Sequence, residues 1–191
     1  MAQELALSLK AVPGAAEQAA FSMDEEGFRQ FYGRTARSLR AYLSRIVGNS
    51  TIADDLHQES YFRFLRAELP EMDDRGHKNY LFRIATNLAR DHFRRSKRTE
   101  KPLPEIPVGE RTGEKINLRT DMSRALEKLK PRERELLWLA YVEGSTHIEI
   151  AETVGVKPAS IKMLLFRARQ RLATVLREKG FEPETSMKVR P

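Results

Sequence analysis

The feature that most constrains the fold is the spacing of apolar residues, which recur every three or four positions along most of the chain. This period matches the turn of an α-helix, and no stretch alternates apolar and polar residues as a half-buried strand would. The first such run contains Phe28, Phe31, Tyr32, Leu39, Tyr42, Leu43 and Ile46. The sequence therefore predicts an all-α protein.

Capping residues and helix breakers divide the first part of the chain into three predicted helices. Ser22 followed by Glu25 has the spacing of a capping box, which predicts the start of the first helix. The second helix is expected over residues 51–69, because the proline that follows cannot continue it. The third is expected over residues 79–98. Three helices of this length can enclose a small core, so residues 23–98 are interpreted as one domain.

A second domain is predicted beyond a break in the pattern. Prolines and glycines concentrate between residues 102 and 113, which is typical of a linker. Apolar periodicity returns at Leu118, and one helix is expected to begin at Pro131, where a missing N–H costs nothing. The predicted organisation is a disordered N-terminal arm over 1–22, a helical domain over 23–98, a flexible linker over 99–117, a second helical domain over 118–179 and a C-terminal tail over 180–191.

Composition limits the functions open to such a chain. The net charge of +7 favours a polyanionic partner such as nucleic acid, and a merely solvated basic surface is the alternative. The absence of cysteine excludes disulfides and thiolate metal sites within the chain. No apolar run approaches the roughly 20 residues of a membrane span. Glu4, Lys10 and Pro13 interrupt the apolar N-terminal residues, so we expect a cytoplasmic protein without a signal peptide.

The most specific pattern is a predicted helix-turn-helix over residues 146–172. Thr146 and Glu149 form a capping box, and Gly155 stands where the turn between two helices needs a positive φ. The second helix of the motif carries its polar and basic residues opposite an apolar stripe. Those we expect to contact DNA in the major groove are Ser160, Lys162, Met163, Phe166, Arg167 and Gln170. An amphipathic hairpin with a solvated basic face is the alternative.

A basic stripe runs along the predicted helix 79–98. A helical wheel puts Arg83, Asn87, Arg90, Arg94 and Lys97 opposite the apolar face. Such a stripe suits contact with phosphates and bases. Tyr80 and Phe82 lie near its start, where aromatic rings can stack on unpaired bases. The alternative is that both rings belong to the core and the arginines only solvate the helix.

The predicted helix 51–69 carries a face of a different character. Its members are Asp55, Gln58, Glu59 and Phe62, while His57 points toward the core. The acids could indicate a metal or acid–base site formed with Asp54, but His57 lies on another face and no second ligand cluster is visible. An exposed aromatic among acids is more typical of a protein-docking surface.

Together these segments resemble the extracytoplasmic-function (ECF) group of sigma factors of bacterial RNA polymerase. Residues 53–59 (ADDLHQE) resemble region 2.2, residues 80–91 (YLFRIATNLARD) resemble regions 2.3 and 2.4, and the helix-turn-helix resembles region 4. The resemblance implies a region 2-like bundle and a region 4-like domain. It also implies a non-enzymatic protein without a cofactor.

The resemblance assigns roles to these surfaces. It implies docking of Asp55, Gln58, Glu59 and Phe62 on the β′ coiled coil of polymerase, and of the second domain on the β flap. It implies contact of the minus-ten promoter element with Lys78, Tyr80, Arg83, Asn87, Arg90 and Arg94, with an unpaired base held by a loop over residues 71–78 that contains His77. The helix-turn-helix would read the minus-thirty-five element, and an anti-sigma factor is a further expected partner.

Two departures and three rival functions stay open at this point. Tyr80 stands where the family usually has Trp, and Met163 and Leu164 stand where Ser and Arg are common, so promoter preferences are not carried over. The rivals are an autonomous helix-turn-helix regulator, a sigma-mimicking protein that captures an inhibitor, and a metal enzyme. Binding to duplex DNA without polymerase would favour the first of them.

Overall fold

The computed structural model describes residues 23–98, 118–178 and 180–181. The predicted arm, the predicted linker over 99–117 and most of the predicted tail lie outside the described residues. The described elements are α1 (Glu25–Val47), α2 (Ser50–Arg66), α3 (Asp74–Arg98), α4 (Leu118–Glu127), α5 (Pro131–Tyr141), α6 (His147–Val154) and α7 (Pro158–Glu178). All are α-helices, which confirms the predicted fold class.

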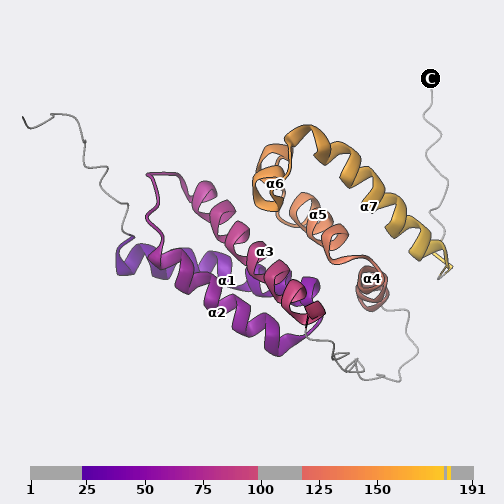
Figure 1. Ribbon diagram of the computed structural model, residues 1–191, viewed down its shortest axis with the longest axis horizontal. Coiled ribbons are helices and arrows are strands. Elements are labelled where there is room, and N and C mark those ends of the chain that lie inside the picture. Colours follow the sequence, from indigo (N-terminus) through magenta and orange to yellow (C-terminus); the bar gives the residue numbers. More distant parts are fainter. Residues whose placement is uncertain (1–22, 99–117, 179, 182–191) are drawn as a thin grey trace, which may run out of the picture.

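Helices α1, α2 and α3 pack side by side as one unit (Figure 1). Leu39 and Leu43 of α1 are fully buried among them, and the ring of Phe31 stacks on that of Phe64 of α2 with centroids 5.0 Å apart. Burial of each such side chain stabilises the fold by about 1.5–3 kcal/mol. The apolar period of the sequence therefore marks the faces that form this core.

The start of α1 and the end of α2 differ from the predicted positions. The predicted capping box at Ser22 is wrong, because the Asp24 carboxylate is the N-cap of α1 and accepts the Gly27 N–H at 2.8 Å. Helix α2 ends at Arg66, before its predicted end, with the next residue extended. The chain then turns Leu69 back into the core. Proline at position 70 disfavours helical geometry in the residue before it, so the helix cannot extend through Leu69 as predicted.

Helix α3 begins at Asp74, five residues before its predicted start. The Asp73 carboxylate accepts the Gly76 N–H at 2.7 Å, which satisfies one of the free donors at the helix N-terminus. His77, predicted to lie in a loop, is therefore inside the first turns of α3. It is buried, with its ring edge-on to those of Phe31 and Phe64.

Helices α4 to α7 form the second unit, and the local predictions for it are confirmed. Pro131 is the first residue of α5, and Thr146 and Glu149 form the capping box of α6. Gly155 ends α6 with φ of 64°. The core of this unit contains Ala125, Leu129, Leu137, Ala168 and Val175.

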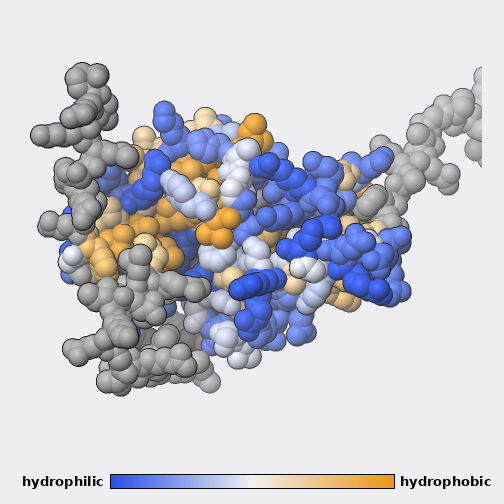
Figure 2. Space-filling model, turned by 180° about the vertical axis from the view of Figure 1, so that it is seen from behind, coloured by the Kyte–Doolittle hydropathy of each residue, from blue (hydrophilic) through white to orange (hydrophobic). Residues whose placement is uncertain are grey.

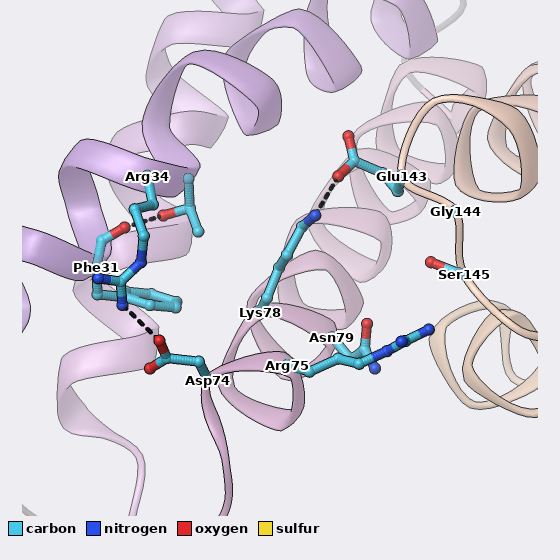
Figure 3. Close-up of a pocket in the computed structure, with 10 residues that line it drawn as sticks. Phe31, Arg34, Asp74, Arg75, Lys78, Asn79, Glu143, Gly144 and Ser145 are labelled. Atoms are coloured by element: carbon cyan, nitrogen blue, oxygen red, sulfur yellow. Dashed lines mark hydrogen bonds and ion pairs between the residues drawn. The ribbon is translucent and has the colours of Figure 1, made fainter.

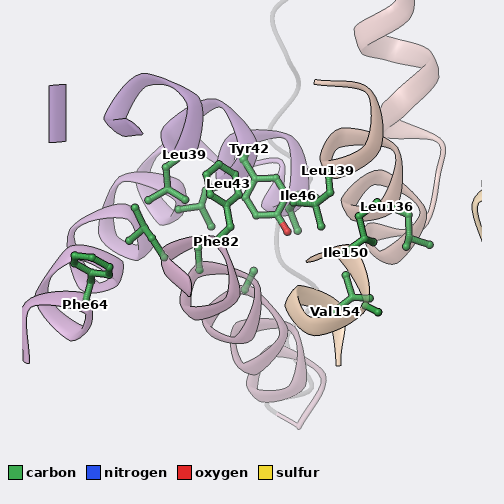
Figure 4. Close-up of a cluster of buried hydrophobic side chains, with 14 of the residues drawn as sticks. Leu39, Tyr42, Leu43, Ile46, Phe64, Phe82, Leu136, Leu139, Ile150 and Val154 are labelled. Carbon is green, nitrogen blue, oxygen red and sulfur yellow. The ribbon is translucent and has the colours of Figure 1, made fainter. Parts of the chain in front are cut away.

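The two units pack directly against each other, a contact that the sequence patterns did not predict. Helix α5 lies on α1, and α6 lies on α3 (Figure 1). One cluster of buried side chains runs from α1 and α3 into α5 and α6 (Figure 4). Within it the ring of Tyr42 lies 6.3 Å from that of Trp138. The described part of the chain therefore forms one body with two sub-cores.

Candidate protein and nucleic-acid interfaces

The acidic and aromatic face of α2 lies at the surface. Asp55, Gln58, Glu59 and Phe62 together line one open, shallow hollow. Phe62 is 53% exposed, although the Arg66 guanidinium lies 4.9 Å from its ring centroid. Glu59 is bound at 2.6 Å by Arg63 one turn along the helix. An exposed ring beside carboxylate and amide groups can anchor a protein partner.

Asp54 and His57 serve the structure of this unit. Asp54 accepts two bonds from Arg40 of α1, at 2.6 and 3.0 Å, and this arginine holds the pKa of the carboxyl below its usual value. His57 is buried with Nε2 3.2 Å from the Ala36 carbonyl oxygen, and burial lowers its pKa. His57 thus faces the core as predicted. Among the described residues, no group of three or more His, Asp or Glu side chains is arranged to hold a metal ion.

Part of the basic stripe of α3 is exposed to solvent, and part of it contacts the second unit. Arg83, Asn87 and Arg94 are exposed, the last with a 3.0 Å ion pair to Asp91. Arg90 is instead turned toward the second unit, where it binds the Glu135 carboxylate at 2.7 Å and the Val154 carbonyl at 2.9 Å. The stripe predicted as a single DNA-binding surface is therefore partly occupied.

Lys78 and its neighbours at the start of α3 also contact the second unit (Figure 3). Lys78 Nζ lies 2.6 Å from Glu143 in the loop between α5 and α6. Glu149 of α6 is bound by Arg75 through both carboxylate oxygens and by Asn79 at 2.9 Å. These contacts lower the pKa of Glu149 to about 2, and the hydrogen bonds from Arg75 have the largest effect. The predicted base-holding loop is thus shorter than expected, since residues 74–78 are helical.

The two aromatic residues beside the stripe have different roles. Phe82 is buried, and its ring lies 5.2 Å from that of Tyr42. Tyr80 is half-buried against the same core, with the Arg83 guanidinium 4.9 Å from its ring centroid. Of the two, only Tyr80 has surface available for a base. The core interpretation holds for Phe82.

The outer face of α7 is open along its length. Ile161, Leu165 and Ala168 are buried, as the helical wheel predicted. Every residue predicted to contact DNA from this helix is exposed: Ser160, Lys162, Met163, Phe166, Arg167 and Gln170. The turn at Gly155 presents this face away from α6. The geometry is that of a helix-turn-helix whose second helix is free to enter a major groove.

Three acidic residues whose long-range contacts the sequence patterns did not predict lie between the units. Glu135, Glu143 and Glu149 accept bonds from Arg90, Lys78 and Arg75 respectively. Each partner lies more than 40 positions away in the sequence, so no local pattern could pair them. The only local signal is at position 135, where an acid interrupts the apolar run of α5.

Comparison with known proteins agrees with this division into two helical units. The Sigma-70 region 2 family matches residues 31–99, and the Sigma-70, region 4 family matches residues 119–172. The chain is 33% identical to the ECF RNA polymerase sigma factor SigE of Mycolicibacterium smegmatis, over 89% of this chain and 68% of that protein. It is 29% identical to the probable ECF sigma factor SigI of Mycobacterium tuberculosis, over 71% of this chain and about half (52%) of that protein.

A solved structure shares the fold. The sigma factor RpoE of Bartonella quintana, determined in complex with the anti-sigma factor NepR, matches with a TM-score of 0.64 and 22% identity. The match covers 80% of this chain and 98% of that one.

These findings define a transcription initiation factor of the sigma-70 type, a class of DNA-binding proteins that are not enzymes. The chain belongs to the ECF sigma factors of bacterial RNA polymerase, and it directs promoter-specific transcription initiation. None of the helices that the structure describes is both long and apolar enough to cross a membrane.

Proposed function

We propose that the chain divides promoter recognition among three faces: α2 binds core polymerase, α3 binds the minus-ten element and α7 binds the minus-thirty-five element. The observation that carries this proposal is the exposure of the α2 and α7 faces on one body with a basic stripe on α3 between them. Such a protein acts where RNA polymerase is, in the cytoplasm. The assignment of individual residues rests on the family resemblance and on their exposure.

The α2 face, meaning Asp55, Gln58, Glu59 and Phe62, is the proposed contact with the β′ coiled coil of polymerase. Its acids carry the charge opposite to that of the protein as a whole, which keeps this surface away from DNA. A second polymerase contact, with the β flap, is proposed on the α4–α7 unit. Figure 2 shows hydrophobic residues gathered over this unit, while the surface over α1–α3 is mainly hydrophilic.

The DNA contacts follow from charge and shape. Arg83, Asn87 and Arg94 are placed to bind the minus-ten strand, and Tyr80 to stack on an unpaired base. Lys78 and Arg90 complete this proposed set. On α7, Lys162 and Arg167 supply donors for base edges or phosphates, and the exposed Met163 and Phe166 supply apolar contacts such as thymine methyl groups accept.

An anti-sigma factor is a proposed regulatory partner. RpoE, a structural neighbour, was determined in complex with such a protein. The exposed apolar side chains on the α4–α7 unit, which include Tyr141, Val142 and Ile148, support a protein contact there.

Run-off transcription with bacterial core polymerase on pooled promoter fragments tests the function. We expect discrete transcripts that require the protein, and Asp55→Ala should reduce them at least tenfold by weakening polymerase binding, since a contact at an interface centre contributes about 2 kcal/mol. Glu68→Ala, which removes an exposed acid outside the α2 face, is the matched control and should leave transcription unchanged. Tight DNA binding without polymerase, in the absence of any transcript, would instead favour an autonomous regulator.

A further inference from the structure

The centre of the exposed face of α7 is apolar. Met163 stands two residues after Ile161 and two residues before Leu165, both of which are buried, so it points almost directly away from the core. Phe166 follows three residues later and therefore lies beside Met163 on the same face. Met163 is 54% exposed and Phe166 is 49% exposed. The helix thus presents two adjacent apolar side chains at the part of its surface that would enter a major groove furthest.

Two cations flank this apolar pair, one on each side. The same helical geometry places Lys162 next to Phe166 and Arg167 next to Met163 around the helix. Both cations are exposed, and α7 carries no acidic residue before Glu178 at its end. Contacts with phosphates position a protein on a duplex, whereas contacts with base edges select the sequence. Cations at both edges of the face suit the two backbones that border the groove, which leaves the apolar pair for the base edges.

Two apolar side chains can distinguish few features of a base pair. In the major groove guanine, adenine and cytosine present hydrogen-bonding groups, and thymine presents an acceptor and a C5-methyl group. Neither a phenyl ring nor a thioether donates a hydrogen bond, and the thioether sulfur is only a weak acceptor. The unbranched methionine side chain also adapts to irregular apolar surfaces. The feature of DNA that this pair fits is therefore a methyl group, which it can bury.

We propose that Met163 and Phe166 make recognition of the upstream element depend on C5-methyl groups, so that α7 selects thymine at the base pairs that face them. Because the feature recognised is the methyl group, 5-methylcytosine is a second base of the same class. The inference rests on the proposed function of α7 and names the base feature that this helix reads. Lys162 and Arg167 contribute affinity for the backbone, while Met163 and Phe166 determine the choice of base.

The size of the effect follows from the burial of one methyl group. Burial of a single methyl or methylene group changes an equilibrium constant by about fourfold. Loss of one contacted methyl group should therefore weaken binding by about fourfold, and loss of two by about fifteenfold. Changes of this size are readily measured by titration of labelled promoter fragments.

Uracil tests the proposal directly, because it pairs as thymine does and lacks only the C5-methyl group. Run-off transcription gives the start sites, and promoter duplexes are then made with uracil at the thymines of the upstream element alone. We expect core polymerase loaded with the full chain to bind this duplex about fourfold more weakly for each methyl group contacted. Uracil at spacer thymines is the matched control and should leave the affinity unchanged. Equal affinity for all these duplexes, or an upstream element without thymine on either strand, would overturn the proposal.

Variants of α7 assign the methyl dependence to particular side chains. Met163→Ala and Phe166→Ala should weaken binding of the thymine duplex and bring the ratio of thymine to uracil affinities toward one. Lys162→Ala, on the same helix, should weaken binding of both duplexes equally and keep the wild-type ratio. All three side chains are exposed, so we expect the variants to fold like the wild type. A wild-type ratio in both apolar variants would contradict the assignment and leave the pair as a contact for a protein partner.

Cytosine and 5-methylcytosine test the methyl group in a second base. At a position where uracil weakens binding, a C·G pair in place of T·A should also bind more weakly. Methylation of that cytosine should then restore about fourfold. A loss with uracil but no gain with 5-methylcytosine would mean that duplex shape, and not a methyl contact, decides the affinity.

These results separate failure of this inference from failure of the proposed function. If polymerase with the chain initiates transcription and protects the upstream element, but binds thymine and uracil duplexes equally, only methyl recognition is lost. If no transcript forms, or the upstream element is not protected, the proposed function of α7 itself fails.

Discussion

Gly155 has a backbone conformation that other residues adopt only at a cost. Its φ of 64° ends α6 and starts the turn into α7, and no atom lies within 4 Å of a Cβ built there. Gly155→Ala should therefore destabilise the protein by about 1–2 kcal/mol through backbone strain alone. Urea unfolding followed by circular dichroism measures the change.

Substitution of Gly33 should change stability in the opposite direction and serves as the control. It lies inside α1 with equally open space around its Cβ position and an ordinary helical conformation. Gly33→Ala should stabilise the protein by about 0.5–1 kcal/mol, since alanine loses less entropy in a helix than glycine. Destabilisation of similar size at both positions would show that crowding, and not backbone conformation, decides the effect at Gly155.

Glu149 gives the contact between the units a defined pH dependence. Its pKa is lowered to about 2, chiefly by the hydrogen bonds from Arg75. A carboxyl whose pKa is lower in the folded protein stabilises it fully above the ordinary value near 4.5, and that contribution is lost as the pH falls toward 2. We expect acrylamide quenching of the fluorescence of Trp138, which is half-buried at this contact, to rise as the pH is lowered from about 5 to about 2.

The matched variant isolates this carboxyl from the others. Glu149→Gln keeps an acceptor for the α6 cap but removes the charge, so it should show a smaller change in quenching over the same pH range. Its quenching at neutral pH should already lie above that of the wild type. An identical acid profile in both proteins would place the titration at another carboxyl.

At the scale of single elements, the exposed face of α7 can be tested for contact with the upstream promoter element. Lys162 and Arg167 are both exposed on the face that the helix-turn-helix presents. Lys162→Ala and Arg167→Ala should each weaken binding of polymerase holoenzyme to the upstream promoter element by about 1–3 kcal/mol if they contact bases. Footprinting on promoters with intact and scrambled upstream elements distinguishes the cases, because a loss of equal size on both would mean that the side chains contact phosphates alone.

Much of each element was predictable because its signals are local. Pro131 starts α5 and Gly155 ends α6 because of their own backbone preferences. The Thr146 cap of α6 bonds to Glu149, only three residues away. The predicted start of α3 is too late because the apolar period begins at Leu81, whereas the Asp73 carboxylate caps the helix several residues earlier. The pair Asp73-Asp74 carries that capping signal, and it lies outside the stretch of apolar periodicity.

The contact between the units could not be predicted from such signals. A helical wheel puts Arg90 on the polar face of α3, and it cannot tell an arginine that faces water from one that faces a buried glutamate. The wheel correctly predicted exposure for Arg83 and Asn87 of the same stripe. The difference is set by Glu135, which lies 45 residues further along and belongs to another unit.

At the scale of the whole molecule, the number of cationic side chains available to DNA sets how DNA affinity responds to salt concentration. Each cation that binds a phosphate of single-stranded DNA steepens the slope of log K against log salt by about 0.7. Release of Arg90 by Glu135→Gln should therefore steepen the slope for a single-stranded oligonucleotide by about that amount relative to the wild type. Affinity titrations at several salt concentrations give the slope, and tighter binding with an unchanged slope would mean that Arg90 does not bind phosphate.

The double engagement of Arg90 has a consequence for how such proteins diversify. If the same side chain serves both the promoter and the partner unit, a change at position 90 that suits a new promoter also alters the resting state of the protein. Glu135 and the α6 carbonyl at Val154 then restrict which substitutions α3 can accept. The two halves of the chain are therefore not freely interchangeable. In a chimera that joins one half of this protein to the other half of a relative, the residues that meet between the two units would not match unless both sets were exchanged together.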